Sequence, residues 1–344
     1  MASFQCETDE LASIPPGTVS VKVVDGGSYL PAPDYRLLPR SVTELTIDDY
    51  KFEWALSPLP GWLVSLTLTE VTDPGSDCQL PPELEKLVLI DCSLDQLGPF
   101  PSSLQSLEIN GCYELCRIEP LPPVMTLVEI VGNSKLSDFS FLPTERVDRL
   151  TLTGVYALES LDKTPAEVGV FTIDSCEKIR SLAGIKQVTG SLRIKDCSIP
   201  GDLTSLASPI ETLHLIRVIL DDAMIPASVK HLVLSYCRLD LAVLPRGLES
   251  LSHWPSRLQS LKGIPEDLVR LELAKLRHLV SYAELPLFLR HISIKEVPGP
   301  KDFPRLAHLE SAEIDYVMTK DRTEYTSGEQ YLADSKMKAK SARS

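Results

Sequence analysis

The amino-acid sequence predicts a repeat solenoid of about fifteen short repeats. Three observations lead to this fold class. A template of apolar residues recurs at intervals of roughly 21 residues. Each copy contains the two-residue alternation of a half-buried strand. The segments between copies are short and rich in proline, which favours extended or 3₁₀ backbone on the convex face and leaves little room for α-helix.

The template reads Pro-x-x-Leu-x-x-Leu-x-Leu-x-x-Cys, and it is clearest at 81–92, 101–112 and 226–237. Its last position serves as a register mark. One interval between marks is about twice the usual length and holds two compressed repeats. Chance would not keep such a register over most of the chain. The marks fall on Tyr50, Val71, Cys92, Cys112, Asn133, Val155, Cys176, Cys197, Val218, Cys237, Leu276, Val297 and Val317.

The core pattern Leu-x-x-Leu-x-Leu-x-x-Cys/Asn resembles the leucine-rich-repeat consensus. The Leu-Pro-Pro sequences at Leu80 and Leu121 are most similar to the short repeats of bacterial effector proteins and of some protist leucine-rich-repeat proteins. The resemblance covers nearly the whole chain and implies a horseshoe in which each repeat adds one short strand to a parallel β-sheet on the concave face, but it says little about function. In this family the register position is Cys or Asn and points inward to bind loop backbone, which implies a structural role for the register cysteines and Asn133.

The repeats divide the chain into three parts. Residues 1–14 are expected to form an N-terminal cap, in which Phe4, Leu11 and Ile14 cover the first strand, because a terminal repeat otherwise exposes its apolar face. The solenoid occupies 15–317. Residues 318–344 form a polar, locally basic tail. Its composition favours disorder, and the alternative is a short helix near 329–338 that leaves a lysine cluster to contact an acidic surface.

Composition restricts the class of partner and the compartment. The chain has 34 Lys and Arg against 48 Asp and Glu, a net charge of −14, so nucleic acid is not an expected partner. We find neither a secretory signal nor the ~18 apolar residues of a membrane helix, and therefore expect a cytoplasmic protein that does not bind membranes. In that compartment the 8 cysteines should be reduced.

Motifs that carry chemistry are missing from the sequence. Nucleotide-binding loops, the His-Glu-x-x-His metal motif and the serine-hydrolase elbow do not occur. Cys112 and Cys116 lack a second pair of ligands for zinc. His214 and His231 should lie on neighbouring strands, where solvated histidines are commoner than a metal or acid–base pair. We therefore expect no catalytic residue, no cofactor and no metal.

The side chains that point outward from the predicted strands show a segregation of charge. They stand six, four and two residues before each register mark, with a fourth just before it. Asp and Glu dominate the first strands, whereas Arg, Lys and His dominate the later ones, with some acidic residues between them. This pattern predicts an electrostatically matched partner, although any solvated sheet face carries charges. The candidate partner-binding residues are Glu108, Glu129, Arg193, Lys195, His214, Arg217, His231, Tyr236, Arg270, Lys275, His291 and Lys295.

The sequence is compatible with two functions. The first is a non-enzymatic protein–protein interaction module that binds another protein mainly through its concave sheet face. The second is a structural subunit of a large intracellular assembly, cytoskeletal or ribonucleoprotein, that uses its convex face and C-terminal tail.

Overall fold

The computed structural model describes residues 3–24, 34–48, 59–72, 79–197, 203, 206, 208–218, 225–237, 240–254, 258–298, 304, 306 and 308–317. The chain forms two compact units. Unit 1 comprises Met1–Ile179 and Gly184–Gln187, and unit 2 comprises Arg180–Ala183 and Val188–Ser344. The predicted tail, 318–344, and Cys78 lie outside the described residues.

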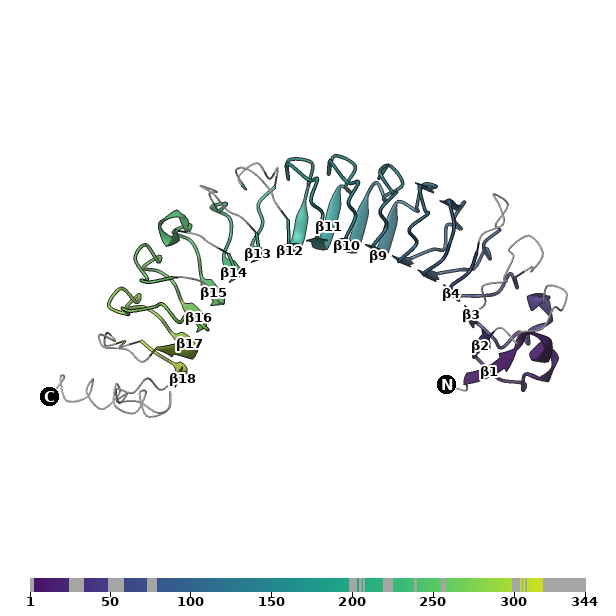
Figure 1. The fold of residues 1–344 in the computed structure, drawn as a ribbon, viewed down its shortest axis with the longest axis horizontal. Coiled ribbons are helices and arrows are strands. Elements are labelled where there is room, and N and C mark those ends of the chain that lie inside the picture. Colours follow the sequence, from purple (N-terminus) through teal and green to yellow (C-terminus); the bar gives the residue numbers. More distant parts are fainter. Residues whose placement is uncertain are drawn as a thin grey trace. The chain divides into compact units, whose positions relative to one another are not determined.

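Unit 1 is a parallel β-solenoid whose strands follow the order of the chain (Figure 1). Short bridging strands β6 (Gln96–Leu97) and β8 (Arg117–Ile118) pair with each other, and the 3₁₀ helices η1 (Thr8–Ser13) and η2 (Tyr35–Leu37) lie between strands of the main sheet. The main strands are β1 (Ser3–Glu7), β2 (Ser20–Val24), β3 (Glu44–Asp48), β4 (Ser65–Thr69), β5 (Lys86–Ile90), β7 (Ser106–Asn110), β9 (Val124–Val131), β10 (Arg146–Thr153) and β11 (Glu167–Asp174).

Unit 2 repeats the same parallel arrangement. The long interval between register marks holds a single strand, β15, and Leu258 and Leu261 lie on the segment that returns to the next strand. The 3₁₀ helix η4 spans Leu241–Val243. The strands are β12 (Val188–Lys195), β13 (Thr212–Ile216), β14 (His231–Ser235), β15 (Ser250–Trp254), β16 (Arg270–Ala274), β17 (His291–Pro298) and β18 (Ser311–Val317).

Stacked apolar columns form the core of each unit, because alternate strand residues point inward. In β7, Leu107 and Ile109 are fully buried, and Glu108 between them is only half-buried. Leu107 stands opposite Leu87 of β5 and Val128 of β9. Each such side chain contributes roughly 1.5–3 kcal/mol by leaving water. The predicted period-two alternation is therefore confirmed.

The segments that return from one strand to the next are extended, as their proline content predicts. Within the described ranges they contain 3₁₀ turns and no α-helix. The Pro-x-x-Leu part of the template is itself a turn, in which the leucine N–H donates to the proline carbonyl. This bond measures 3.1 Å at Leu104 and 3.0 Å at the equivalent Val229. The turn directs the fourth residue inward at the start of each layer.

The register-mark residues form a second inward column that ties adjacent layers together. The Cys92 thiol donates to the carbonyl oxygens of Ile90 and of Leu68 in the preceding layer, at 3.4 and 3.5 Å. Cys237 repeats this contact with Ser235 and Leu215, and Asn133 Nδ2 donates to the Val131 carbonyl at 2.9 Å. Burial raises the pKa of the Cys237 thiol. The structural role that the family resemblance implies for these residues is confirmed for them.

The N-terminal residues expected to form a cap contribute a strand of their own. β1 pairs in parallel with β2, and the sheet therefore begins at Ser3. Leu11 and Ile14 are buried beside it, and Phe4 is half-buried. The three-part division of the chain stays a prediction. No helix among the described residues is long and apolar enough to cross a membrane.

Candidate protein-interaction surface

At or next to the end of most strands of the described ranges lies a residue in the left-handed conformation, which we call the corner position. The φ angles at these positions lie between 49° and 72°. The sequence pattern places Arg217, Tyr236 and Lys275 on strands, but the structure places them at corners, one residue beyond each strand end. The corners are Glu70, Asp91, Gly111, Gly132, Gly154 and Ser175 in unit 1, and Asp196, Arg217, Tyr236, Lys275 and Glu296 in unit 2.

The strand face of unit 2 comprises the outward side chains of β12–β17 and the corner residues that follow them. Register pairing places candidate residues of this face directly opposite one another on neighbouring strands. Arg193 stands opposite His214, and Arg270 stands opposite His291. In unit 1, Glu108 stands opposite Glu129 in the same way. Like charges at directly opposed positions destabilise a sheet unless other groups compensate them.

Several candidate charges are already compensated by neighbours. The carboxylate of Asp196 pairs with Arg217, and Lys195 lies 3.7 Å from the same carboxylate. Hydrogen bonding from Arg217 lowers the pKa of Asp196. Further ion pairs join Lys86 to Glu108 at 2.7 Å, Lys295 to Glu313 at 2.9 Å, and Lys275 to Glu296 at 3.7 Å.

Two of the candidate arginines lack such compensation. Among the described residues, Arg193 and Arg270 have no carboxylate within ion-pair distance, and both are exposed. His231 is exposed as well. Burial, followed by the charge of Arg193, lowers the pKa of His214. His214 is therefore neutral near pH 7, and Arg193 carries the positive charge of this couple.

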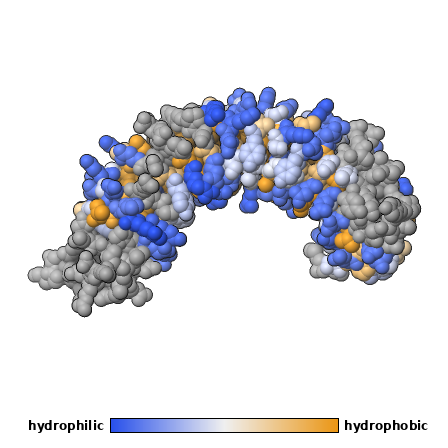
Figure 2. Space-filling view, viewed as in Figure 1, coloured by the Kyte–Doolittle hydropathy of each residue, from blue (hydrophilic) through white to orange (hydrophobic). Residues whose placement is uncertain are grey.

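Two further candidates differ from these in their surroundings. Tyr236 is 60% exposed at its corner. His291 contacts Ser311 Oγ at 2.8 Å and lies 3.7 Å from a carboxylate oxygen of Glu310. Figure 2 shows that hydrophilic side chains cover much of the visible surface of both units, with smaller hydrophobic areas between them.

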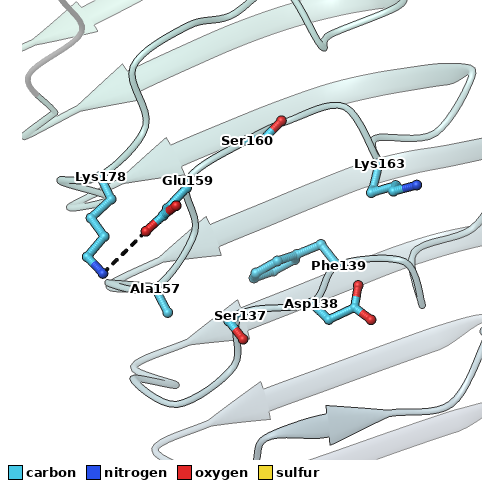
Figure 3. A pocket seen from close by; sticks show the side chains of 8 residues that line it. All are labelled: Ser137, Asp138, Phe139, Ala157, Glu159, Ser160, Lys163 and Lys178. Atoms are coloured by element: carbon cyan, nitrogen blue, oxygen red, sulfur yellow. Dashed lines mark ion pairs between the residues drawn. The ribbon is translucent and has the colours of Figure 1, made fainter.

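A polar cavity of about 350 Å³ lies between returning segments of unit 1 (Figure 3). Its charged groups compensate one another. Lys178 pairs with Glu159 at 3.6 Å, and the Asp138 carboxylate accepts hydrogen bonds from the backbone N–H and the hydroxyl of Ser140. Those bonds, the backbone one first, lower the pKa of Asp138. The cavity therefore offers no excess of charge to an ionic ligand. Its lining residues are Ser137, Asp138, Phe139, Ala157, Glu159, Ser160, Lys163 and Lys178.

Sequence reasoning missed three features that the structure shows. Tyr113 and Tyr156 are half-exposed beside the glycine corners of unit 1. His253 is buried at an inward position of β15. Leu287 and Phe288 are exposed on the turn that precedes β17. No group of three or more His, Cys, Asp or Glu in the described part of the chain could hold a metal ion.

No protein-family model and no curated protein matches the chain. Among solved structures, it is similar to the crystal structure of CroV588, described as a novel circular LRR protein, with 13% identity and a TM-score of 0.36. That match covers 91% of this chain and 72% of the other. At such identity the likeness concerns the fold alone. The recurring template, the parallel strands and the inward Cys/Asn column are those of a leucine-rich-repeat-type solenoid.

Proposed function

We propose that the chain is a non-enzymatic protein-interaction module that binds an acidic region of a partner protein through the strand face of unit 2. Solenoids of this type generally act as scaffolds for protein interaction, because stacked layers present an extended surface. The proposal places the protein in the cytoplasm, and the free thiols of Cys92, Cys112 and Cys237 suit a reducing compartment.

The observation that supports this function best is the pair of exposed arginines without carboxylate partners in the described part of the chain. Arg193 also stands opposite His214, an arrangement that brings no attraction within the sheet. A carboxylate of a partner would compensate Arg193, and the planar guanidinium of an arginine can bind one through two parallel hydrogen bonds. Arg270 offers the same chemistry further along the face.

The compensated cations should contribute less to binding. Lys195, Arg217, Lys275 and Lys295 would have to exchange an existing carboxylate for that of a partner. Exposed ion pairs are worth about 0–1 kcal/mol, so the exchange brings little net gain. We therefore assign the strongest contacts to Arg193 and Arg270, with Tyr236 as an exposed aromatic neighbour of the kind enriched at interfaces. Glu108 and Glu129 of unit 1 stay predicted contacts.

The test is a parallel affinity purification with three forms of the protein. The wild type, the double variant Arg193→Glu/Arg270→Glu and the control Arg246→Glu are each coupled to resin. Arg246 is exposed on a turn outside the strand face, so the control is also a charge reversal. A partner should be recovered with the wild type and the control and lost with the double variant.

Binding of the purified partner then gives the quantitative result. Replacing both arginines should lower the affinity by about tenfold or more at low salt, and the difference should shrink as salt rises. Equal recovery with all three forms would refute the strand face as the binding site. Pelleting of the protein with a large assembly, unchanged by the double variant, would instead support the structural-subunit function.

A further inference from the structure

The Pro-x-x-Leu turn that precedes β17 differs from its counterparts at the two middle positions. In most other repeats these positions hold small or polar residues, with Trp62 of the Pro60–Leu63 turn as an exception, whereas here both hold large apolar residues, Leu287 and Phe288, which are 59% and 60% exposed. Exposed apolar side chains that lie together mark a surface that can bind a partner. The equivalent pairs in other repeats are Ser102–Ser103, Ala227–Ser228, Arg246–Gly247 and Glu266–Asp267.

A cleft of about 500 Å³ opens next to these two side chains, entirely within unit 2. Its walls are two successive returning segments, which lead into β16 and β17. Leu261 and Ile264 come from the first segment, and Leu285 and Pro286 come from the second. The Phe288 ring stacks on the ring of His308, with 5.5 Å between centroids and 20° between planes. This stacking holds Phe288 at the edge of the cleft.

Hydrogen bonds within each wall form the cleft in advance of any ligand. The N–H of Ile264 donates to the Leu261 carbonyl at 3.1 Å, and the N–H of Leu285 donates to the Tyr282 carbonyl at the same distance. Gly263 has a φ of +90°, and a Cβ there would lie 2.6 Å from the backbone nitrogen of Ala242. The first wall therefore packs against the preceding layer more closely than any other residue would allow.

The charges around the cleft are mainly negative. Glu266 and Glu284 line it, and Asp267 follows Glu266 directly. All three are exposed, and within the described ranges none forms an ion pair. Lys262 is the only cation among the lining residues. An occupant that covers the apolar floor would therefore gain from basic groups at its ends.

We propose that this cleft binds a peptide segment of a partner protein in which two adjacent large apolar side chains are flanked by lysine or arginine. The apolar pair covers Leu287 and Phe288 and enters the cleft, while the basic groups contact Glu266 and Glu284. The site lies on the turns that precede the strands and uses none of the residues assigned to the strand-face function, so either can fail without the other.

The test measures binding of a fluorescent synthetic peptide with a Phe-Leu pair flanked by two lysines on each side, with a glutamate-flanked peptide as control. The decisive variant is Leu287→Ser/Phe288→Ser, because Ser102–Ser103 occupies the same turn positions naturally. This variant should keep its melting temperature within about 2 °C and lose affinity for the lysine peptide at least tenfold. A second variant, Glu266→Lys/Glu284→Lys, should lose affinity for the lysine peptide and gain it for the glutamate peptide.

Three results would overturn the proposal. The first is no saturable binding of the lysine peptide up to about 1 mM, which corresponds to negligible affinity. The second is unchanged binding to the double-serine variant, which would mean that the peptide contacts acidic surface elsewhere. The third is binding that occurs only when residues 318–344 are removed, which would assign the cleft to the chain's own C-terminal segment rather than to a partner.

Discussion

The two units build their corners with the same backbone conformation and different residues. Three successive corners of unit 1 are Gly111, Gly132 and Gly154, whereas every corner recorded in unit 2 carries a side chain. Because the φ angles are alike, the turn itself does not require glycine. A residue with a Cβ in this conformation costs roughly 1–2 kcal/mol. Unit 2 bears that cost at every recorded corner and presents charged and aromatic groups there, whereas unit 1 bears it only at Glu70, Asp91 and Ser175.

The glycine corners of unit 1 lie beside aromatic side chains. A Cβ on Gly132 would lie 3.8 Å from the Tyr113 ring, and one on Gly154 would lie 3.8 Å from the Tyr156 hydroxyl. The difference between the units therefore concerns their surfaces. In unit 1, Tyr113 and Tyr156 lie beside the glycine corners Gly132 and Gly154. In unit 2, the recorded corner residues themselves carry the side chains at this surface.

The cores differ at one layer as well. The second inward position of each strand is aliphatic in unit 1 from β2 to β11, as at Ile109 and Ile130, but in β15 of unit 2 it is His253. His253 stands between Leu234 and Leu273 of the neighbouring strands and is 1% exposed. Burial lowers the pKa of His253 to about 4. One layer of unit 2 therefore places a titratable side chain, His253, within the otherwise aliphatic column.

The largest effect should come from truncating the aliphatic columns themselves. Leu107→Ala in unit 1 and Leu234→Ala in unit 2 should each lower the free energy of unfolding by about 2–5 kcal/mol. Native-state hydrogen exchange should locate the loss in the altered unit, because layers interact mainly with their neighbours. Glu108→Ala, which removes an exposed ion pair with Lys86, should cost less than about 1 kcal/mol. An equal loss for Glu108→Ala and Leu107→Ala would contradict the inward assignment.

The His253 layer should make the stability of unit 2 depend on pH. Since the pKa of His253 in the folded state, about 4, lies below the ordinary histidine value of 6.5, the unfolded state binds the proton first as pH falls. The stabilisation is complete above pH 6.5 and decreases as pH falls toward 4, with a total loss of about 3 kcal/mol. Denaturant titrations at pH 7 and pH 5 should show roughly 2 kcal/mol of this loss.

His253→Leu is the matched control for that titration, because leucine occupies the same position in the layers on both sides. The variant should lose most of the decline between pH 7 and pH 5, keeping the smaller part that comes from the lowered pKa of His214 and the acid unfolding that carboxylates cause at lower pH. If the wild type and His253→Leu declined equally over this range, another group would be responsible and the assignment to His253 would be wrong.

The smallest effect should come from alanine at the corners. Gly132→Ala should cost about 1 kcal/mol, because it introduces a Cβ into a left-handed residue. Gly111→Ala should cost more, since its Cβ would lie 2.1 Å from Asp91 Oδ1 and the carboxylate would have to move. Lys275 already has a Cβ in the left-handed conformation, so Lys275→Ala adds no backbone strain. The free energy of unfolding of this variant should stay within about 0.5 kcal/mol of wild type. Thermal melts of the three variants would rank them, and equal costs at all three corners would remove the distinction between the units.

The fold could be predicted from sequence because its determinants are local and repeated. The alternation Leu-x-Leu, the Pro-x-x-Leu turn and the register cysteine each act within one layer, and every further copy strengthened the assignment. β1 was not predicted, since Ser3–Glu7 contains no copy of the template. The corner conformation was missed because only three glycines signalled it, whereas Arg217 and Lys275 are not residues that commonly mark a positive φ.

The candidate surface was predictable only in part. Alternation placed Arg193 and His214 side by side correctly. The pairing of Arg217 with Asp196 joins corners of successive layers, and it depends on the directions of side chains that a one-dimensional pattern does not contain. His253 and the Leu287–Phe288 pair did have a signal. Each departs from the residues that most other repeats hold at the same position, so a comparison between repeats would have found them.

The hydrogen bonds at the corners have a consequence for the length of the protein. The N–H of Gly111 donates to the Val131 carbonyl, and the N–H of Gly132 donates to the Thr153 carbonyl, so each corner makes the same bond to the following layer. Removing residues 111–131 would join Asn110 to Gly132. The alternation of inward and outward residues would be kept, and the corner N–H of Gly132 could still donate to the Thr153 carbonyl of the following layer. A gene that encodes such layers can lose or duplicate whole repeats by recombination between them. The protein it encodes can then become shorter or longer without a new fold.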